Sequence, residues 1–156
     1  MSIKLIEKPK FDIKPKMEKE SKKEDKSESM NSEAIEFVSY FLGCSTMLHI
    51  MHLQNSNPAV HNPLGNLYEE VSDIIDSVIE KHQGCKGALL KGYKNYDLSE
   101  YEGMSPLKYV QDLKEYLWED RYKAFDKNDS AIQNEIDNLA NALNQCLFHL
   151  SFNKPL

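Results

Sequence analysis

Hydrophobic positions recur at helical spacing along most of this chain. From about residue 33 onward, apolar residues return every three or four positions, the period of helices with one buried face, and no stretch alternates as a strand does. The pattern predicts four helices. They cover Glu33 to Gln54, Pro63 to Lys81, a stretch that begins at Pro106 behind Ser105, and a stretch after Asp126 to Asp129.

Turn residues set the expected helix ends. Asn62 and Ser105 are each followed by proline, and both side chains suit a helix cap because they accept hydrogen bonds from the first turn. Gly84 is expected to end the second helix in the left-handed conformation. These signals divide the chain into helices and connections of different length.

The connections predict the topology. About eight residues join the first two helices, about five join the last two, and about twenty separate the second from the third. Short connections favour antiparallel hairpins, and the long one favours a crossover along the bundle. One long crossover between two hairpins is the ferritin-like arrangement, so the chain is predicted to be an all-α, ferritin-like four-helix bundle.

Residues 1–30 differ from the rest in charge and hydropathy. They hold nine lysines against seven acids, a net charge of +2, which leaves −8 for residues 31–156 of a chain whose total is −6. Few apolar residues lie among these charges, so we expect a flexible arm before a bundle of residues 31–156. The arm is expected to be solvated or ordered by a partner. Nucleic acid is not expected to bind, because acids alternate with the lysines.

Composition narrows the class of protein. No strictly apolar run approaches the roughly 20 residues that span a bilayer, and the first ten residues lack the apolar stretch of a signal peptide. The three cysteines (Cys44, Cys85 and Cys146) are far apart, so neither a disulfide framework nor a zinc knuckle is indicated. We therefore expect a cytoplasmic protein without membrane association.

Histidines gather around the first predicted turn. His49 and His52 are three residues apart and share a helix face, and the turn brings His61 beside them. On the second helix, Asp73 and Asp76 continue with Glu80 at three- and four-residue steps as an acidic stripe. Imidazole and carboxylate together form a ligand set for iron, manganese or zinc.

Helix geometry separates these two groups within one chain. His61 and Asp76 are fifteen residues apart, which is roughly 20 Å along a helix axis. Two copies of the hairpin packed antiparallel across a two-fold axis would bring the histidine end of one subunit to the acidic end of the other. A mixed metal site is therefore expected at an isologous homodimer interface formed by helices one and two. The alternative for these residues is an interfacial network of hydrogen bonds and salt bridges.

The ligand spacing resembles the ferroxidase centre of Dps-type mini-ferritins, which is built between two subunits by the first two helices. Eleven residues separate His49 from His61, fourteen separate His61 from Asp76, and three separate Asp76 from Glu80. A longer string resembles small ferritin-like proteins of tailed bacteriophages more closely: HxxHLQ, a second histidine segment, LxxxY, an acidic helix and a final QG. This resemblance covers about 36 residues strongly and residues 85–156 only through topology.

The resemblance implies a metal-binding homo-oligomer, with iron, or else manganese or zinc, as its cofactor and oxidation of ferrous iron as its activity. The implied metal ligands are His49, His61, Asp76 and Glu80, with His52 and Asp73 as weaker candidates. One position departs from the pattern, because Gly65 stands where mini-ferritins place a carboxylate.

The phage resemblance also implies an alternative function. The chain would then be a virion-associated structural or assembly protein that uses the bundle as a non-catalytic interaction module. Residues 1–30 would contact other virion proteins, and the protein would be found in the host cytoplasm or in the virion.

Overall fold

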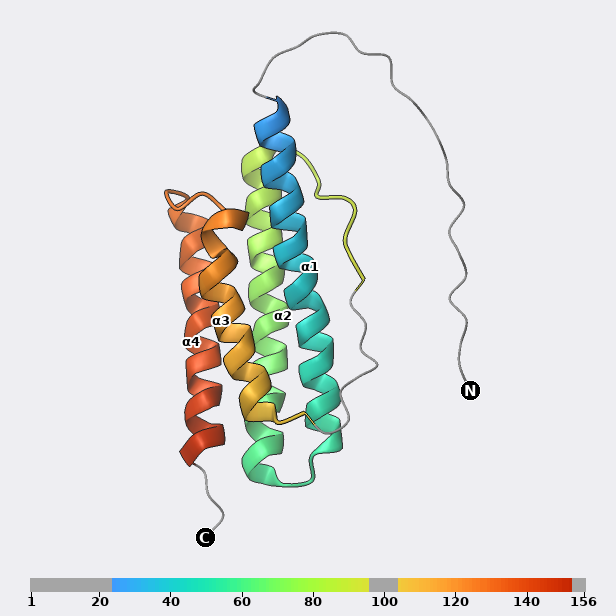
Figure 1. The fold of residues 1–156 in the computed structure, drawn as a ribbon, viewed down its shortest axis with the longest axis vertical. Helices are drawn as coiled ribbons and strands as arrows, with labels where there is room; N and C mark the ends of the chain where they lie inside the picture. The colour runs from blue at the N-terminus through green and yellow to red at the C-terminus, as the bar shows by residue number, and fades with distance from the viewer. Residues whose placement is uncertain (1–23, 96–103, 153–156) are drawn as a thin grey trace, which may run out of the picture.

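The computed structural model describes residues 24–95 and 104–152, which form four α-helices. These are α1 (Glu24–Gln54), α2 (Pro58–Lys86), α3 (Pro106–Ala124) and α4 (Ser130–Phe152), drawn in Figure 1. The described residues contain no strand. The predicted all-α four-helix bundle is confirmed.

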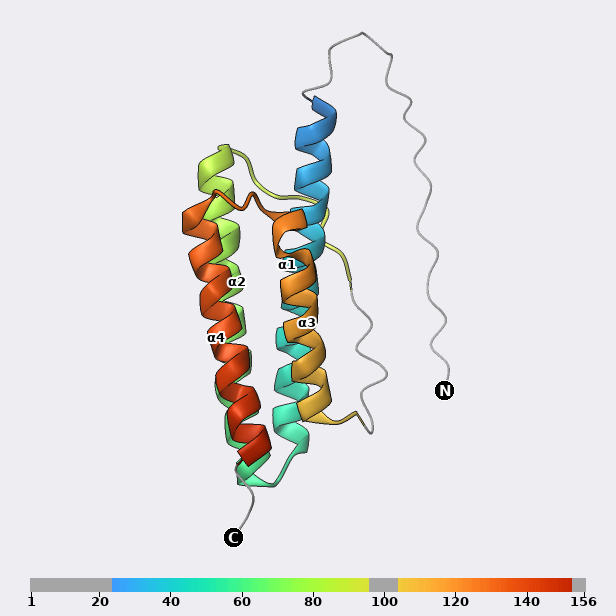
Figure 2. The ribbon, with the colours of Figure 1, turned by 60° about the vertical axis from the view of Figure 1, so that its left-hand side comes forward.

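Each helix packs against two neighbours. α1 contacts α2 and α3, and α4 contacts the same two helices, so α1 lies diagonally opposite α4. Figure 2 shows α2 beside α4 and α1 beside α3. α2 ends at one end of the bundle and α3 begins at the other, so these two helices run in the same direction (Figure 1). This is the predicted connectivity, with two antiparallel hairpins joined by one long crossover.

The interior is filled by the predicted apolar stripes together with a group of aromatic rings. Phe37 lies at the centre of that group, with ring centroids 4.9 Å from Phe41 and 5.5 Å from Phe125. Burying side chains of this size stabilises the fold by about 1.5 to 3 kcal/mol each. Other predicted positions that are fully or almost fully buried are Val38, Leu64, Leu67, Val71, Ile75, Val78, Val110, Leu113, Leu117, Ile132, Ile136, Leu139 and Leu143.

Both long helices begin earlier than expected. α1 starts at Glu24, so residues 24–30 of the predicted arm are helical, and residues 1–23 lie outside the described part. α2 starts at Pro58, where the Asn57 side chain accepts a hydrogen bond from the Ala59 N–H at 3.0 Å. Pro63 therefore lies inside the helix. The sequence contains the Asn-Pro start signal twice, and the chain uses the first, which adds a turn of helix that carries His61.

α2 ends at Lys86, later than expected. Gly87 caps it with a left-handed backbone (φ 63°), in place of the predicted cap at Gly84. The first part of the crossover then lies along α1. The Lys94 N–H donates to the Ser39 hydroxyl at 3.0 Å, and Leu90 is buried. α3 begins as predicted, with Ser105 accepting a hydrogen bond from the Lys108 N–H.

One part of α1, Asn31–Gln54, is long and apolar enough to meet the length and composition of a membrane span. Its most apolar window is 56% buried inside the bundle, and a core helix of a helical bundle meets the same criteria. This feature is therefore weak evidence for a membrane.

A buried cation joins α3 to α4. Arg121 is only 3% exposed, and its guanidinium donates to the Gln133 side-chain oxygen from Nε (3.0 Å) and Nη2 (2.7 Å). Its Nη1 lies 2.8 Å from a carboxylate oxygen of Asp137. The rings of Trp118 and Tyr122 each lie with their centroid 4.9 Å from the guanidinium carbon. The sequence pattern did not predict this network.

His82 is buried beside Phe125, with Nε2 3.5 Å from the Asn31 side-chain oxygen. Burial lowers the pKa of His82 below its usual value, and the charge of Lys86 lowers it further. Between the folded and unfolded pKa values the unfolded chain binds a proton that the folded chain does not, so stability is lost as the pH falls.

We expect the parent chain to lose more unfolding free energy than the His82→Leu variant between about pH 7.5 and pH 5.5. Urea unfolding at both pH values measures this difference. Equal losses in the two proteins would contradict the assignment to His82.

Candidate metal centre at the α1–α2 turn

Four rings from two helices meet where α1 turns into α2. We call His49, His52, His61 and Tyr68 the histidine cluster. The rings of His52 and His61 stack with centroids 3.7 Å apart, and His49 stacks on Tyr68 at 4.1 Å. His49 is exposed and the other three are half-buried. The sequence predicted that two imidazoles would converge at this turn, and the structure brings three together with a tyrosine that the sequence did not predict.

Backbone carbonyls fix the orientation of two of these rings. Nδ1 of His52 lies 2.8 Å from the His61 carbonyl oxygen, and Nδ1 of His61 lies 2.8 Å from the His52 carbonyl oxygen. A carbonyl oxygen only accepts, so each Nδ1 carries the hydrogen and donates it. In the neutral ring this leaves the lone pair on Nε2. Metal-binding histidines are commonly held in this way, with one nitrogen bonded to the protein and the other directed at the ion.

The stacking limits what one chain can bind. An imidazole coordinates through a lone pair in the plane of its ring, and the planes of His52 and His61 are only 28° apart. Their lone pairs therefore do not converge on a common point at the 2.0 to 2.1 Å that a zinc–nitrogen bond requires. Among the described residues, no three histidine, cysteine, aspartate or glutamate side chains form a metal-binding group.

The acidic stripe lies further along the same helix. Asp73, Asp76 and Glu80 are exposed on α2, and none of them makes an ion pair with another described residue. α2 is continuous from Pro58 to Lys86, so His61 and Asp76 are separated by roughly 20 Å of helix, as expected. The structure therefore brings the histidines together but does not bring the carboxylates to them within one chain.

Gly65 has a steric role that the sequence did not reveal. A β-carbon at this position would lie 2.9 Å from both Cε1 and Nδ1 of His52, closer than such atoms approach. The His52 ring therefore occupies the space that a side chain at position 65 would need. Any carboxylate there, as in the mini-ferritin pattern, would displace His52 from the His61 carbonyl oxygen.

Comparison with known proteins gives a family without a function. A family of unknown function, DUF5856, matches residues 52–150, about two thirds of the chain. The chain belongs to this family. The DUF5856 match runs from His52 to Leu150 in α4 and includes His61, Gly65 and the acidic stripe, while His49 lies outside it. No curated protein and no solved structure matches the chain.

Proposed function

We propose that this protein forms an isologous dimer through the outer faces of α1 and α2 and binds a transition metal ion between the subunits. His49 and His61 of one subunit and Asp76 and Glu80 of the other would supply the ligands, with Asp73 as a further candidate and His52 as an alternative to His61, on which it is stacked. Iron, manganese and zinc all suit imidazole and carboxylate ligands. Oxidation of iron is not part of this proposal, because Gly65 replaces a carboxylate of the mini-ferritin set.

The observation that supports the proposal most is the fixed orientation of His61. Its Nδ1 donates to the carbonyl oxygens of His52 (2.8 Å) and Asn55 (3.0 Å), so Nε2 is the nitrogen left for an ion. Asp76 and Glu80, which make no ion pair with a described residue, provide negative charge further along the same helix. An antiparallel two-fold axis would bring the histidines of each subunit to the carboxylates of the other, and so would form the site twice.

The outer surface of α1 also suits a dimer interface. Leu42 is 39% exposed and Leu53 is 67% exposed, and both lie on the helical face that carries His49. Burying two such side chains from each subunit would contribute favourable free energy to association.

Ligand replacement tests the metal site. We expect His61→Ala and Asp76→Ala each to abolish stoichiometric binding of Mn²⁺ or Fe²⁺, measured by calorimetry without oxygen, while circular dichroism shows unchanged helicity. The control Glu70→Gln removes an exposed charge from α2 outside the proposed ligand set and should leave binding intact.

Mixing the His61→Ala and Asp76→Ala variants, neither of which should bind metal alone, tests whether the ligands come from two subunits. A mixed dimer has one site with both His61 and Asp76 intact and one site with neither, so mixing should restore binding to a fraction of the sites. Failure of the mixture to bind, or undiminished binding by the single variants, would overturn the proposal.

A second candidate function is a structural role in a virus particle, as the phage resemblance implies. The contact between His52 and Gly65 favours this role, because the His52 ring occupies the space in which mini-ferritins place a metal-binding carboxylate. A chain that forms a dimer in solution but takes up neither Mn²⁺ nor Fe²⁺ would support this candidate against the first.

A further inference from the structure

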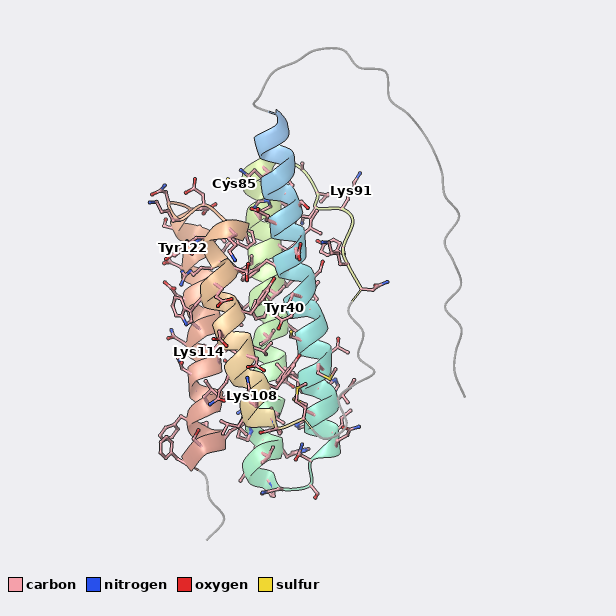
Figure 3. The ribbon with its side chains drawn as sticks, in the orientation of Figure 1. Tyr40, Cys85, Lys91, Lys108, Lys114 and Tyr122 are labelled. Atoms are coloured by element: carbon pink, nitrogen blue, oxygen red, sulfur yellow. The ribbon has the colours of Figure 1, made fainter. Side chains whose placement is uncertain are left out.

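Two aromatic rings stand exposed on α3, on the side that faces away from α1. Trp118 is 47% exposed and Tyr122 is 59% exposed, and Figure 3 shows Tyr122 on this outer side. Glu115 and Glu119 are exposed on the same part of the helix. We call these four residues the aromatic platform.

The buried Arg121 side chain packs against both rings of the platform. The guanidinium of Arg121 lies 4.9 Å from both ring centroids, and it is fixed by Gln133 and Asp137. A surface whose side chains are already fixed loses less conformational entropy when a partner binds. The platform therefore loses less conformational entropy on binding a partner than an isolated exposed ring would.

The charges of the platform are not balanced locally. Glu115 and Glu119 are four residues apart, where like charges repel on a helix, and neither makes an ion pair with a described residue. The nearby Lys123 forms its ion pair with Asp120, and the charge of Glu119 acts on it more weakly. Two rings beside two carboxylates that form no ion pair within the described part of the chain suit a segment that carries proline and lysine, because prolines pack on aromatic rings and lysines interact with both rings and carboxylates.

The chain itself contains such a segment. Residues 8–11 read KPKF and residues 14–17 read KPKM, two tetrads with lysines on both sides of a proline and an apolar residue at the end. Proline favours an extended backbone for itself and for the residue before it. Both tetrads lie in the part of the chain outside the described residues.

We propose that residues 8–17 dock on the aromatic platform of the same chain. Six residues separate Met17, the end of this segment, from Glu24, the start of α1, and the connection spans up to about 24 Å when extended. The required path is shorter than this. Glu36 lies level with Tyr116 and Asp120, roughly 18 Å along α1 from Glu24, and the neighbouring α3 is about 10 Å away.

Tryptophan fluorescence tests the proposal in the full chain, because Trp118 is its single tryptophan. Reversing the charge of three tetrad lysines (Lys8, Lys10 and Lys14 to Glu) should raise the acrylamide quenching constant by about twofold, as the ring loses its cover. The control reverses three lysines outside the tetrads, Lys19, Lys22 and Lys23, and should leave the constant unchanged. Circular dichroism checks that all three proteins are equally helical.

A charge exchange makes the test specific to the platform. Glu115→Lys with Glu119→Lys should expose Trp118 as the tetrad variant does, and combining both sets of reversals should restore its protection. Equal quenching in the parent chain and the tetrad variant would overturn the proposal. Protection that grows with protein concentration would overturn docking within one chain and point to exchange between copies.

Discussion

Replacing Arg121 with alanine is expected to lower the free energy of unfolding by about 2 to 4 kcal/mol. The loss leaves the side-chain oxygen of Gln133, which accepts two hydrogen bonds from the guanidinium, buried without its donor. It also removes the support beneath Trp118 and Tyr122. Urea denaturation of the two proteins at the same pH measures the difference.

Two further variants show which part of the Arg121 network matters. Asp137→Asn should cost less than about 1 kcal/mol, because the Asp137 side chain is 57% exposed and water screens its pairing with Arg121. Arg121→Met combined with Gln133→Leu should recover much of the stability, since no buried polar atom of that pair remains unpaired. A cost below about 1 kcal/mol for the alanine variant would contradict this account.

Replacing Gly65 with alanine is expected to destabilise the protein by about 1 to 3 kcal/mol. The added methyl group would lie 2.9 Å from the ring of His52, which is fixed by its bond to the His61 carbonyl oxygen and by its stack on His61. The ring has to leave that position, so a hydrogen bond and the stack are lost together. Thermal and urea unfolding both report the change.

The sign of this effect should reverse once His52 is removed. In a His52→Ala background the same Gly65→Ala change should stabilise α2 by up to about 1 kcal/mol, because alanine favours a helix more than glycine does. Gly84→Ala is the matched control, since a β-carbon at this position of α2 meets no atom within 4 Å. It should stabilise the parent chain. Destabilisation by Gly65→Ala in both backgrounds would show that His52 is not the cause.

The periodicity of apolar residues predicted the four helices, because each buries one face, and the lengths of the connections between them predicted the topology. It predicted the ends less well. Asn57-Pro58 and Asn62-Pro63 carry the same local signal, and only tertiary packing selects the first. Residues 24–30 have no apolar stripe, so nothing in their pattern indicated that α1 would continue through them.

The sequence predicted which residues belong to the candidate site but not how their side chains contact one another. Spacing along the chain indicated that His49 and His52 share a helix face and that two imidazoles converge where the turn brings His61 to the end of the first helix. It showed that Gly65 was a departure from the mini-ferritin pattern without showing that His52 fills the space. That contact depends on atoms of two helices, which no one-dimensional pattern contains.

Arg121 gave a signal that sequence reasoning overlooked. It follows Leu117 by four residues, on the stripe that also includes Val110 and Leu113, so a charged residue stood at a position facing the core. A charge at such a position implies partners, because an unpaired buried charge is costly. Gln133 was the partner to look for, beside the apolar stripe of the fourth helix.

The two histidines at the α1–α2 turn have a consequence for where the chain tolerates insertion. Each bonds the backbone carbonyl of the other, and Asn55 donates to Met51 within the same few residues, so the turn is closed by its own side chains. Added residues there would pull the rings apart. Lys91 lies in an exposed part of the crossover, between the buried Leu90 and the Lys94 contact, and a tag inserted beside it would disturb fewer bonds.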